Sequence, residues 1–542
     1  MPASSSRNTF SRPLGTSAAV PNSARHEERT GVHLVWGCMS ELEFVALLLA
    51  AIGPLLALAR LLRLPDSLAL FGSGVAVALL PGLPPMRVDP QLMLGLFLPP
   101  VLYASTVRVS FHLLRFTLVS GVLVGAALSL TTILAVAATA HALLPRLGWT
   151  GALCLGVVAA LFDTRLFHEA KARPHVPRAI ADALKAREMV TRITALSVFS
   201  LALQALAKGP PTPAAALGET AYALLGGAAA GAVVGRAITW LRERTEPAPV
   251  EIAISLATPY LSALAARVLG LSAVVTIMIA ALVVSAVRVD PRTGAPRSSS
   301  EARIAATAFW EEVSLILSAV LFFLSGRALP EALRGLKDWP VWQAIGAAAT
   351  LLAVILAAQY ALALASTLRP RLAAALRAHK GRQTGTTRTA AAGVMAWAST
   401  RSVIGLIVAL SLPPALPDGR PFAGRDLVLV VAAFVILGSV LLQGLTLRLA
   451  VRAAALSDEA EERWEEEQAE RAMADAHVQA INGSSDAPAP AAAFDAERRV
   501  LLALRRENRI GDEVLRKMLR ETDLRARATE RSALPGAGPP NP

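Results

Sequence analysis

The chain has 542 residues, of which 54% are hydrophobic and 17% are charged. This composition and a mean hydropathy of +0.51 are rare in soluble proteins of this size, and they predict that lipid surrounds most of the chain. The formal net charge of +13 does not indicate nucleic-acid binding, because the Arg-rich loops of membrane proteins normally set their orientation. We therefore expect a lipid bilayer, and no nucleic acid, as a partner.

The first 40 residues are rich in Ser, Arg and Asn and lack an apolar core. Such a segment does not resemble a cleavable signal peptide, so we expect a disordered leader over 1–40. The two cysteines, Cys38 and Cys154, are too widely separated in sequence to indicate a disulfide framework or a thiolate metal site.

Apolar runs long enough to cross a membrane follow the leader. A membrane-spanning helix needs about 20 mostly apolar residues, because only a helix satisfies its own backbone in hydrocarbon. About thirteen such runs occur, at approximately 41–62, 66–82, 90–107, 112–144, 148–166, 189–207, 218–240, 250–267, 270–287, 307–327, 341–367, 390–412 and 426–452. They predict an all-α polytopic membrane protein.

Lys and Arg residues concentrate in alternate connections between these runs. The loops after the fifth, ninth and eleventh runs are strongly basic, whereas the loop after the fourth run holds only Arg146 and the loop after the sixth only Lys208. Because basic loops stay on the cytoplasmic side, we expect a multi-pass protein of the inner membrane with its N-terminus outside.

The chain changes character after about residue 455, where charged residues become frequent. The sequence predicts a charged helix from Asp458 to Glu470, a Pro/Ala/Ser linker near 483–493 and an amphipathic helix from Glu497 to Leu524. We expect 455–542 to be a cytoplasmic helical tail. It is either a small regulatory or interaction module or a solvated helix that ends the protein.

Few ionisable residues lie inside the apolar runs, and each one costs about 2.5–3.5 kcal/mol on insertion scales. Asp163 ends the fifth run, and Arg401 lies in the middle of the twelfth. Glu188 and Arg192 open the sixth run and share one helix face, because they are four residues apart. No set of nucleophile, base and orienting group and no His cluster with metal-ligand spacing stands out, so we do not expect an enzyme, a resident metal or a cofactor.

Arg401 is flanked by Thr400, Ser402 and other small residues in an otherwise apolar run. Small and hydroxylated neighbours allow a helix to unwind and to satisfy its freed backbone groups, as at the midplane sites of secondary transporters. The alternative is that Arg401 only ties helices together through a carboxylate. In either case we expect Arg401, Thr400 and Ser402 to stabilise the core.

Asp163 is a candidate for ion coupling. A carboxylate that binds a cation and a proton in turn couples the two ions through competition for one negative charge. The alternative is that Asp163 caps the next segment or pairs with a loop arginine at the cytoplasmic interface.

Four segments form a recognisable series along the chain. Phe97 to Tyr103 reads FLPPVLY, and Phe323 to Pro330 reads FLSGRALP. Trp397 to Ser402 reads WASTRS and precedes LSLP, and the tail contains IGDEVL at 510–515. In order and spacing these segments resemble the monovalent cation:proton antiporters of the sodium/proton exchanger type, in particular their bacterial members.

The resemblance implies a fold with inverted repeats in which two unwound helices cross, here the fifth and the twelfth. It implies a transmembrane domain over 41–454, with core helices at about 112–207 and 341–452 and dimer-contact helices at about 41–107 and 218–327. It also implies a homodimer that exchanges a monovalent cation for protons. We expect this cation to be sodium.

The sequence departs from the family at the ion site. Of the family's Thr-Asp-Pro turn, only Asp163 is retained. Where the family has Asn-Asp at the start of the next helix, this chain has Thr191 and Arg192, and Glu188 falls at a family serine. The resemblance therefore places Asp163, Glu188, Thr191 and Arg192 at the ion-binding site, with the transported cation near Asp163.

Three interpretations of the altered site remain open at the level of sequence. Glu188 and Asp163 form a relocated carboxylate pair, Arg192 neutralises Asp163 and locks the core, or Arg192 adapts the site to an anion. The first predicts cation/proton antiport. The second predicts a transport-inactive relative that acts as a membrane sensor or scaffold through its cytoplasmic tail.

Overall fold

The computed structural model is almost entirely helical. It describes the chain in the following segments: 41–61, 64–80, 89–107, 120–164, 178–209, 212–244, 248–286, 300–336, 339–366, 388–415, 419, 422, 424–454, 459–482, 490–507 and 509–532. The leader predicted at 1–40 and most of the basic loop residues lie outside these segments.

The first part of the bundle ends at the first of two short strands. Its elements are α1 (Glu41–Leu61), α2 (Asp66–Ala78), α3 (Pro90–Leu92), the π-helical η1 (Met93–Phe97), α4 (Leu98–Thr106), α6 (Ser120–Leu143), the 3-10 turn η2 (Pro145–Leu147), α7 (Gly148–Ala160) and β1 (Phe162–Asp163).

The middle of the chain consists of long helices that lead to the second short strand. These elements are α9 (Arg178–Lys208), α10 (Pro213–Arg242), α11 (Ala248–Val268), α12 (Ala273–Ala286), α13 (Ser300–Gly335), α14 (Val341–Ser366), α16 (Arg388–Trp397) and β2 (Thr400–Arg401).

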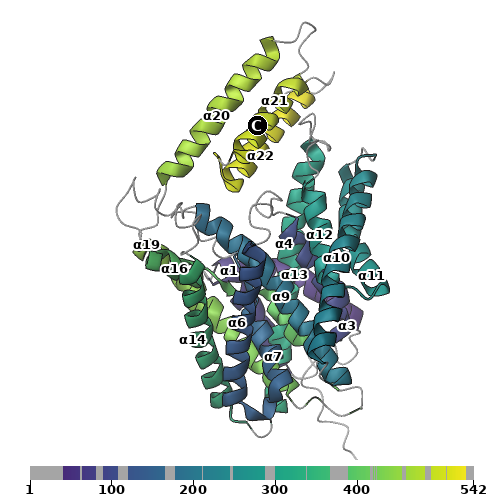
Figure 1. Ribbon diagram of the computed structural model, residues 1–542, viewed down its shortest axis with the longest axis vertical. Helices are drawn as coiled ribbons and strands as arrows, with labels where there is room; N and C mark the ends of the chain where they lie inside the picture. Colours follow the sequence, from purple (N-terminus) through teal and green to yellow (C-terminus); the bar gives the residue numbers. More distant parts are fainter. Residues whose placement is uncertain are drawn as a thin grey trace, which may run out of the picture.

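The last membrane helices and the tail follow β2. They are α17 (Val403–Leu410), α18 (Arg425–Ser439), the π-helical η3 (Val440–Gly444), α19 (Leu445–Ala453), α20 (Glu459–Asn482), α21 (Pro490–Arg506) and α22 (Asp512–Ser532). Figure 1 shows α20, α21 and α22 together at one end of the bundle, and α22 packs against α13.

The all-α membrane fold predicted from the sequence is confirmed. Within the described segments, seven helices are long and apolar enough to cross a membrane, and three shorter apolar helices accompany them. The predicted total of thirteen spans and the domain boundaries stay predictions.

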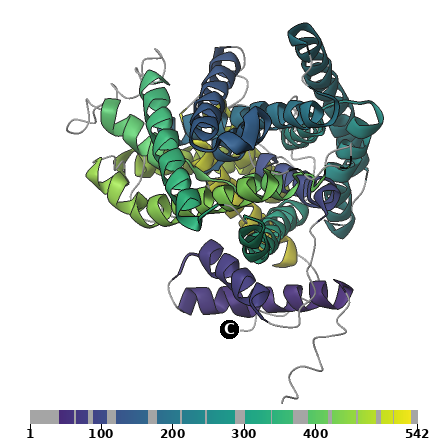
Figure 2. The same ribbon diagram turned by 90° about the horizontal axis from the view of Figure 1, so that it is seen from below.

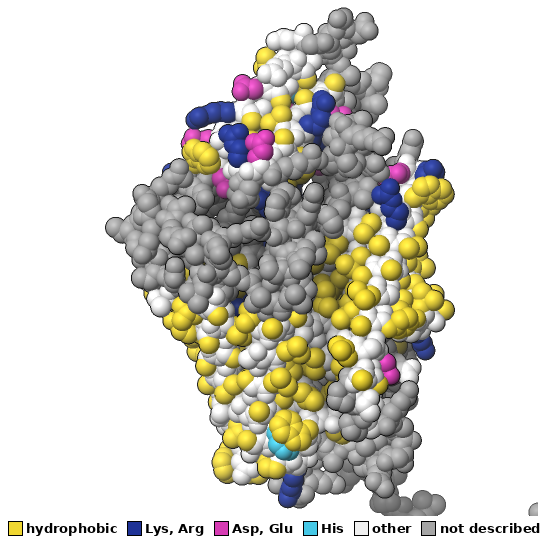
Figure 3. All heavy atoms as spheres, viewed as in Figure 1, with side chains coloured by type: hydrophobic (Ala, Val, Ile, Leu, Met, Phe, Trp, Pro, Cys, Tyr) yellow, Lys and Arg dark blue, Asp and Glu magenta, His cyan; other side chains and the backbone are white. Residues whose placement is uncertain are grey.

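The surface of the bundle is suited to lipid. Figure 3 shows hydrophobic side chains spread over the length of the bundle, whereas many of the visible charged side chains gather at the tail and at the bundle's ends. On α10, Leu217, Leu225 and Val233 are each at least 69% exposed. Exposing such an apolar surface to water is unfavourable, whereas contact with the hydrocarbon of a bilayer is not.

Two helices are interrupted inside the bundle, and their breaks meet. Helix α7 ends before β1 and α16 ends before β2, and the two strands pair antiparallel, Phe162 with Arg401 and Asp163 with Thr400. Ser402 then caps α17 by accepting a hydrogen bond from the Ile404 amide at 3.2 Å. This strand pair is the crossing of unwound segments that the resemblance implied.

Helices α2 and α13 approach each other closely through two glycines. In Figure 2 the N-terminal helices lie along one edge of the bundle, where α2 packs on α13. A Cβ atom on Gly74 would collide with the Phe323 carbonyl oxygen, and one on Gly326 would collide with that of Phe71. The contact therefore depends on backbone meeting backbone.

Exchanging glycine for alanine at two nearby positions of α2 tests this contact. Gly74→Ala should lower stability by about 1–3 kcal/mol, the usual cost of overpacking. Gly72→Ala is the matched control, because nothing lies within 4 Å of a Cβ there, and it should be neutral or slightly stabilising. Thermal unfolding in detergent measures both, and equal melting temperatures for the two variants would contradict the close approach.

Candidate functional site

The strand pair, together with α9, brings the predicted site residues together. Asp163 ends β1, Thr400 and Arg401 form β2, and Glu188, Thr191 and Arg192 lie on α9. All six are buried, with at most 8% of their surface exposed.

Arg401 binds the ends of both interrupted helices. Its Nη1 donates to the Ala159 carbonyl oxygen at the end of α7, and its Nη2 donates to the Ser399 carbonyl oxygen just beyond α16. Helix C-termini carry unpaired carbonyl groups and partial negative charge. One guanidinium therefore satisfies two such ends at once.

The two residues that flank Arg401 hold the strands in register. The Thr400 hydroxyl donates to the Asp163 carbonyl oxygen at 3.0 Å, and the Ser402 amide donates to the Leu161 carbonyl oxygen at 3.2 Å. The Arg401 amide donates to Ser439 Oγ at 3.0 Å. The backbone groups released by the helix breaks thus find partners inside the protein, as a low-dielectric interior requires.

A charged cluster lies next to the strand pair. Arg192 Nη2 donates to Glu188 Oε1 and lies 3.9 Å from Asp163 Oδ2. The Thr164 hydroxyl donates to Glu188 Oε2 at 2.8 Å. Two carboxylates from different elements therefore share one arginine, and both the relocated-pair and the locking interpretations stay open.

Thr191 has a different environment from Arg192. Its hydroxyl lies 2.8 Å from Ser129 Oγ on α6, and Ser129 in turn donates to the Gly125 carbonyl oxygen. Thr191 thus links α9 to α6. Its predicted role as an ion ligand stays a prediction, as do the roles assigned to Asp163, Glu188 and Arg192.

Four polar residues at this site were not singled out from the sequence. The Thr164 hydroxyl binds Glu188, and Arg187 donates to Ser399 Oγ at 2.8 Å while its guanidinium stacks 4.7 Å from the Phe162 ring. From the last membrane helix, Ser439 accepts the Arg401 amide of β2, and Gln443 lies 3.5 Å from the Ser399 carbonyl oxygen just before it. Arg187 was indistinguishable in sequence from the basic loop that precedes it.

The charges of the cluster do not balance. Asp163, Glu188 and Arg192 carry a formal total of one negative charge, from two carboxylates and one guanidinium. At 3.9 Å, the Arg192–Asp163 attraction is about 4 kcal/mol at an effective dielectric constant near 20. Arg192 therefore supplies a positive charge to both carboxylates and leaves one formal negative charge on the three residues.

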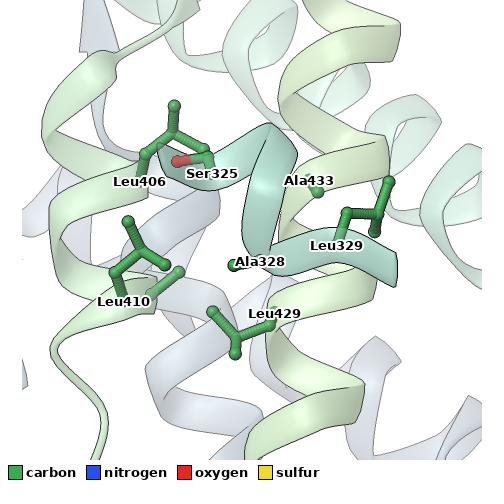
Figure 4. Close-up of a pocket in the computed structure, with 8 residues that line it drawn as sticks. Ser325, Ala328, Leu329, Leu406, Leu410, Leu429 and Ala433 are labelled. Carbon is green, nitrogen blue, oxygen red and sulfur yellow. The ribbon is translucent and has the colours of Figure 1, made fainter. Parts of the chain in front are cut away.

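An apolar cavity elsewhere in the bundle does not compete for this role. It lies between α13, α17 and α18 and has about 10 Å³ of free space, enough for about one water molecule. Figure 4 shows its lining, which contains no ionisable side chain: Ser325, Ala328, Leu329, Leu406, Ala409, Leu410, Leu429 and Ala433.

Comparison with known proteins places the chain in a family. The model of the transmembrane domain of sodium/hydrogen exchangers matches residues 47–453, most of the chain. The chain belongs to the sodium/hydrogen exchanger family. The resemblance inferred from its sequence motifs is therefore confirmed, and the protein is a multi-pass member of a membrane transport family.

Relatives in this family match along most of their length. An uncharacterised Na⁺/H⁺ exchanger of Mycobacterium tuberculosis is 30% identical over 427 residues, which are 78% of this chain and 76% of that protein. The Na⁺/H⁺ antiporter NhaP of Pseudomonas aeruginosa is 26% identical over 72% of this chain and 92% of its own.

A solved exchanger structure shares the fold. The sodium proton antiporter MjNhaP1 of Methanocaldococcus jannaschii aligns with a TM-score of 0.54 and 15% identity, covering 76% of this chain and 97% of its own. At this identity the likeness supports the fold alone.

The two helix ends held by Arg401 give a direct test of its stabilising role. Arg401→Met should lower stability by about 3 kcal/mol or more, because it removes charge-assisted hydrogen bonds to two buried carbonyl groups. The stability of Arg401→Lys should lie between those of the wild type and Arg401→Met. A lysine ammonium keeps the charge, but it cannot reproduce the planar guanidinium that donates to both carbonyl groups. Arg452→Met, at an exposed position of α19, is the control. Detergent melting curves in which Arg401→Met matches Arg452→Met would contradict the assignment.

Proposed function

We propose that this protein exchanges a monovalent cation, sodium in the first place, for protons across the inner membrane. The observation that carries the proposal is the meeting of two buried carboxylates, Asp163 and Glu188, with Arg192 beside the strand pair. Family membership and relatives named as Na⁺/H⁺ antiporters support the same reaction.

Coupling follows from competition at these carboxylates. A buried carboxylate is stable when it is protonated or when a cation neutralises it, and it cannot hold both partners fully at once. Arg192 neutralises part of the charge permanently. The remaining negative charge on Asp163 and Glu188 is then available to a cation or to a proton, but not to both at once.

Arg192 then acts as a tethered counter-ion. An incoming cation displaces the guanidinium from Asp163, where the separation is already 3.9 Å, while the hydrogen bond to Glu188 keeps the guanidinium next to the site. The Thr164 hydroxyl supplies a neutral oxygen close to the carboxylates. Asp163 is the group that we expect to bind the cation.

A second candidate function rests on the same arginine. If Arg192 holds both carboxylates too firmly for a cation to enter, the protein does not transport, and the helices of the tail deliver a signal or a scaffold function. The contact between α22 and α13 gives the tail a route to the membrane domain. The homodimer and the external N-terminus, expected from the resemblance and from loop charges, stay predictions.

Proton movement in everted membrane vesicles tests the proposed function. With the wild-type protein, adding sodium should dissipate an imposed proton gradient, as read from dequenching of a pH-sensitive dye. Asp163→Asn should abolish this signal, because the amide can neither bind a cation electrostatically nor release a proton. Glu188→Gln should reduce the signal strongly.

The control and the contrary outcomes come from the same vesicles. Asp89→Asn changes an exposed aspartate that caps α3 and should retain the wild-type signal. Exchange that survives in both Asp163→Asn and Glu188→Gln would refute the proposed site. No exchange of sodium, potassium or lithium by the wild type, together with a signal from Arg192→Asp, would establish the locked alternative.

A further inference from the structure

A glutamine in the last membrane helix reaches the broken end of α16. Gln443 is fully buried in the π-helical segment η3. Its Nε2 lies 3.1 Å from the Trp397 carbonyl oxygen, 3.4 Å from that of Ala396 and 3.5 Å from that of Ser399. These carbonyl groups belong to the end of α16 and the segment that follows it, where the regular helical hydrogen bonds stop. The Ala396 carbonyl also accepts the Ser399 amide and the Ser399 carbonyl also accepts Arg401 Nη2, so Trp397 is the carbonyl that depends most on Gln443.

The orientation of the Gln443 amide is fixed by Ser439. The Ser439 hydroxyl donates to Gln443 Oε1 and accepts the Arg401 amide hydrogen at 3.0 Å. Because Oε1 is the acceptor in this pair, the NH₂ group faces the carbonyl oxygens of α16. Ser439 and Gln443 therefore hold both the backbone of β2 and the helix that precedes it.

The local helix geometry fits such a task. Segment η3 is π-helical, a form that is rare and that often marks functional sites within longer helices. Another buried glutamine, Gln359 on α14, offers a contrast, because its Oε1 has no partner among the described residues. Gln443 is thus distinguished by its contacts rather than by burial.

We propose that Gln443 is a positioning residue for the ion site, an inference that rests on the proposed cation exchange. Its strongest contact is with the Trp397 carbonyl oxygen, and unwound helices in transporters use such carbonyl groups to bind cations. Through Ser399 it also fixes Thr400, whose hydroxyl donates to the Asp163 carbonyl oxygen at 3.0 Å. The cation is thereby directed to the carboxylates.

Replacing Gln443 with leucine keeps a similar volume and removes both kinds of hydrogen bond. In reconstituted vesicles, Gln443→Leu should raise the KM for sodium about tenfold while the maximal rate changes less, because ion binding and not the transport step loses its geometry. The control Gln359→Leu should leave both constants unchanged. A loss of folded protein alone would lower the maximal rate and leave the KM as it was.

Hydrogen–deuterium exchange gives a readout that does not need transport. In Gln443→Leu, the amides of 398–402 should exchange about tenfold faster, since the strand pair opens more often. Gln359→Leu should not change them. If the wild type shows no cation exchange, the proposed function fails. The exchange rates of the 398–402 amides still test whether Gln443 stabilises the strand pair.

Gln443→Glu tests whether the hydrogen bonds of Gln443, rather than the volume of its side chain, set the geometry of the site. Protonated, the new side chain can accept from Ser439 and donate to one carbonyl oxygen, but ionised it can only accept. Its KM for sodium should therefore approach the wild-type value at acid pH and rise as the pH increases, on top of the wild-type pH profile. An unchanged KM in Gln443→Leu, or unchanged amide exchange at 398–402, would overturn the proposal.

Discussion

A helix that is interrupted inside a membrane leaves backbone carbonyl groups that neither lipid nor water satisfies. Arg401 resolves this constraint for two helices at once, because its guanidinium donates to the Ala159 and Ser399 carbonyl oxygens. The strand pair, the Thr400 hydroxyl and the Ser439–Gln443 pair satisfy further groups at the breaks. The proposed ion site depends on these polar contacts, since Asp163 belongs to the strand pair.

Because the β1–β2 strand pair holds Asp163 in place, the charged side chains of α9 can contact it. Glu188 and Arg192 lie four residues apart on one face of α9, and Thr164 reaches Glu188 from the end of β1. A buried ion pair is costly to assemble, but removal of one partner is costlier still because the other charge is then left unpaired. Arg192 therefore needs its two carboxylate neighbours, whatever the ion chemistry of the site.

The sequence located the charged residues because an ionisable side chain is conspicuous in an apolar run, and Asp163 and Arg401 stood out on that ground. It could not pair Gln443 with residues of α16 more than 40 positions earlier, because such contacts arise only from tertiary packing. Hydropathy also placed the start of the sixth run at 189, whereas α9 begins at Arg178. The first turns of α9 mix buried apolar residues such as Ile180 and Leu184 with several charged residues, so hydropathy alone did not include them in the run.

Equilibrium binding of sodium to the purified protein, at mildly alkaline pH, tests most directly whether Arg192 serves as a tethered counter-ion. A cation that binds Asp163 must replace the Arg192–Asp163 attraction, which is about 4 kcal/mol at 3.9 Å and an effective dielectric constant near 20. Arg192→Met should therefore bind sodium at least about tenfold more tightly than the wild type, and Arg192→Lys should remain close to it. Unchanged or weaker sodium binding in folded Arg192→Met protein would contradict a counter-ion role for Arg192.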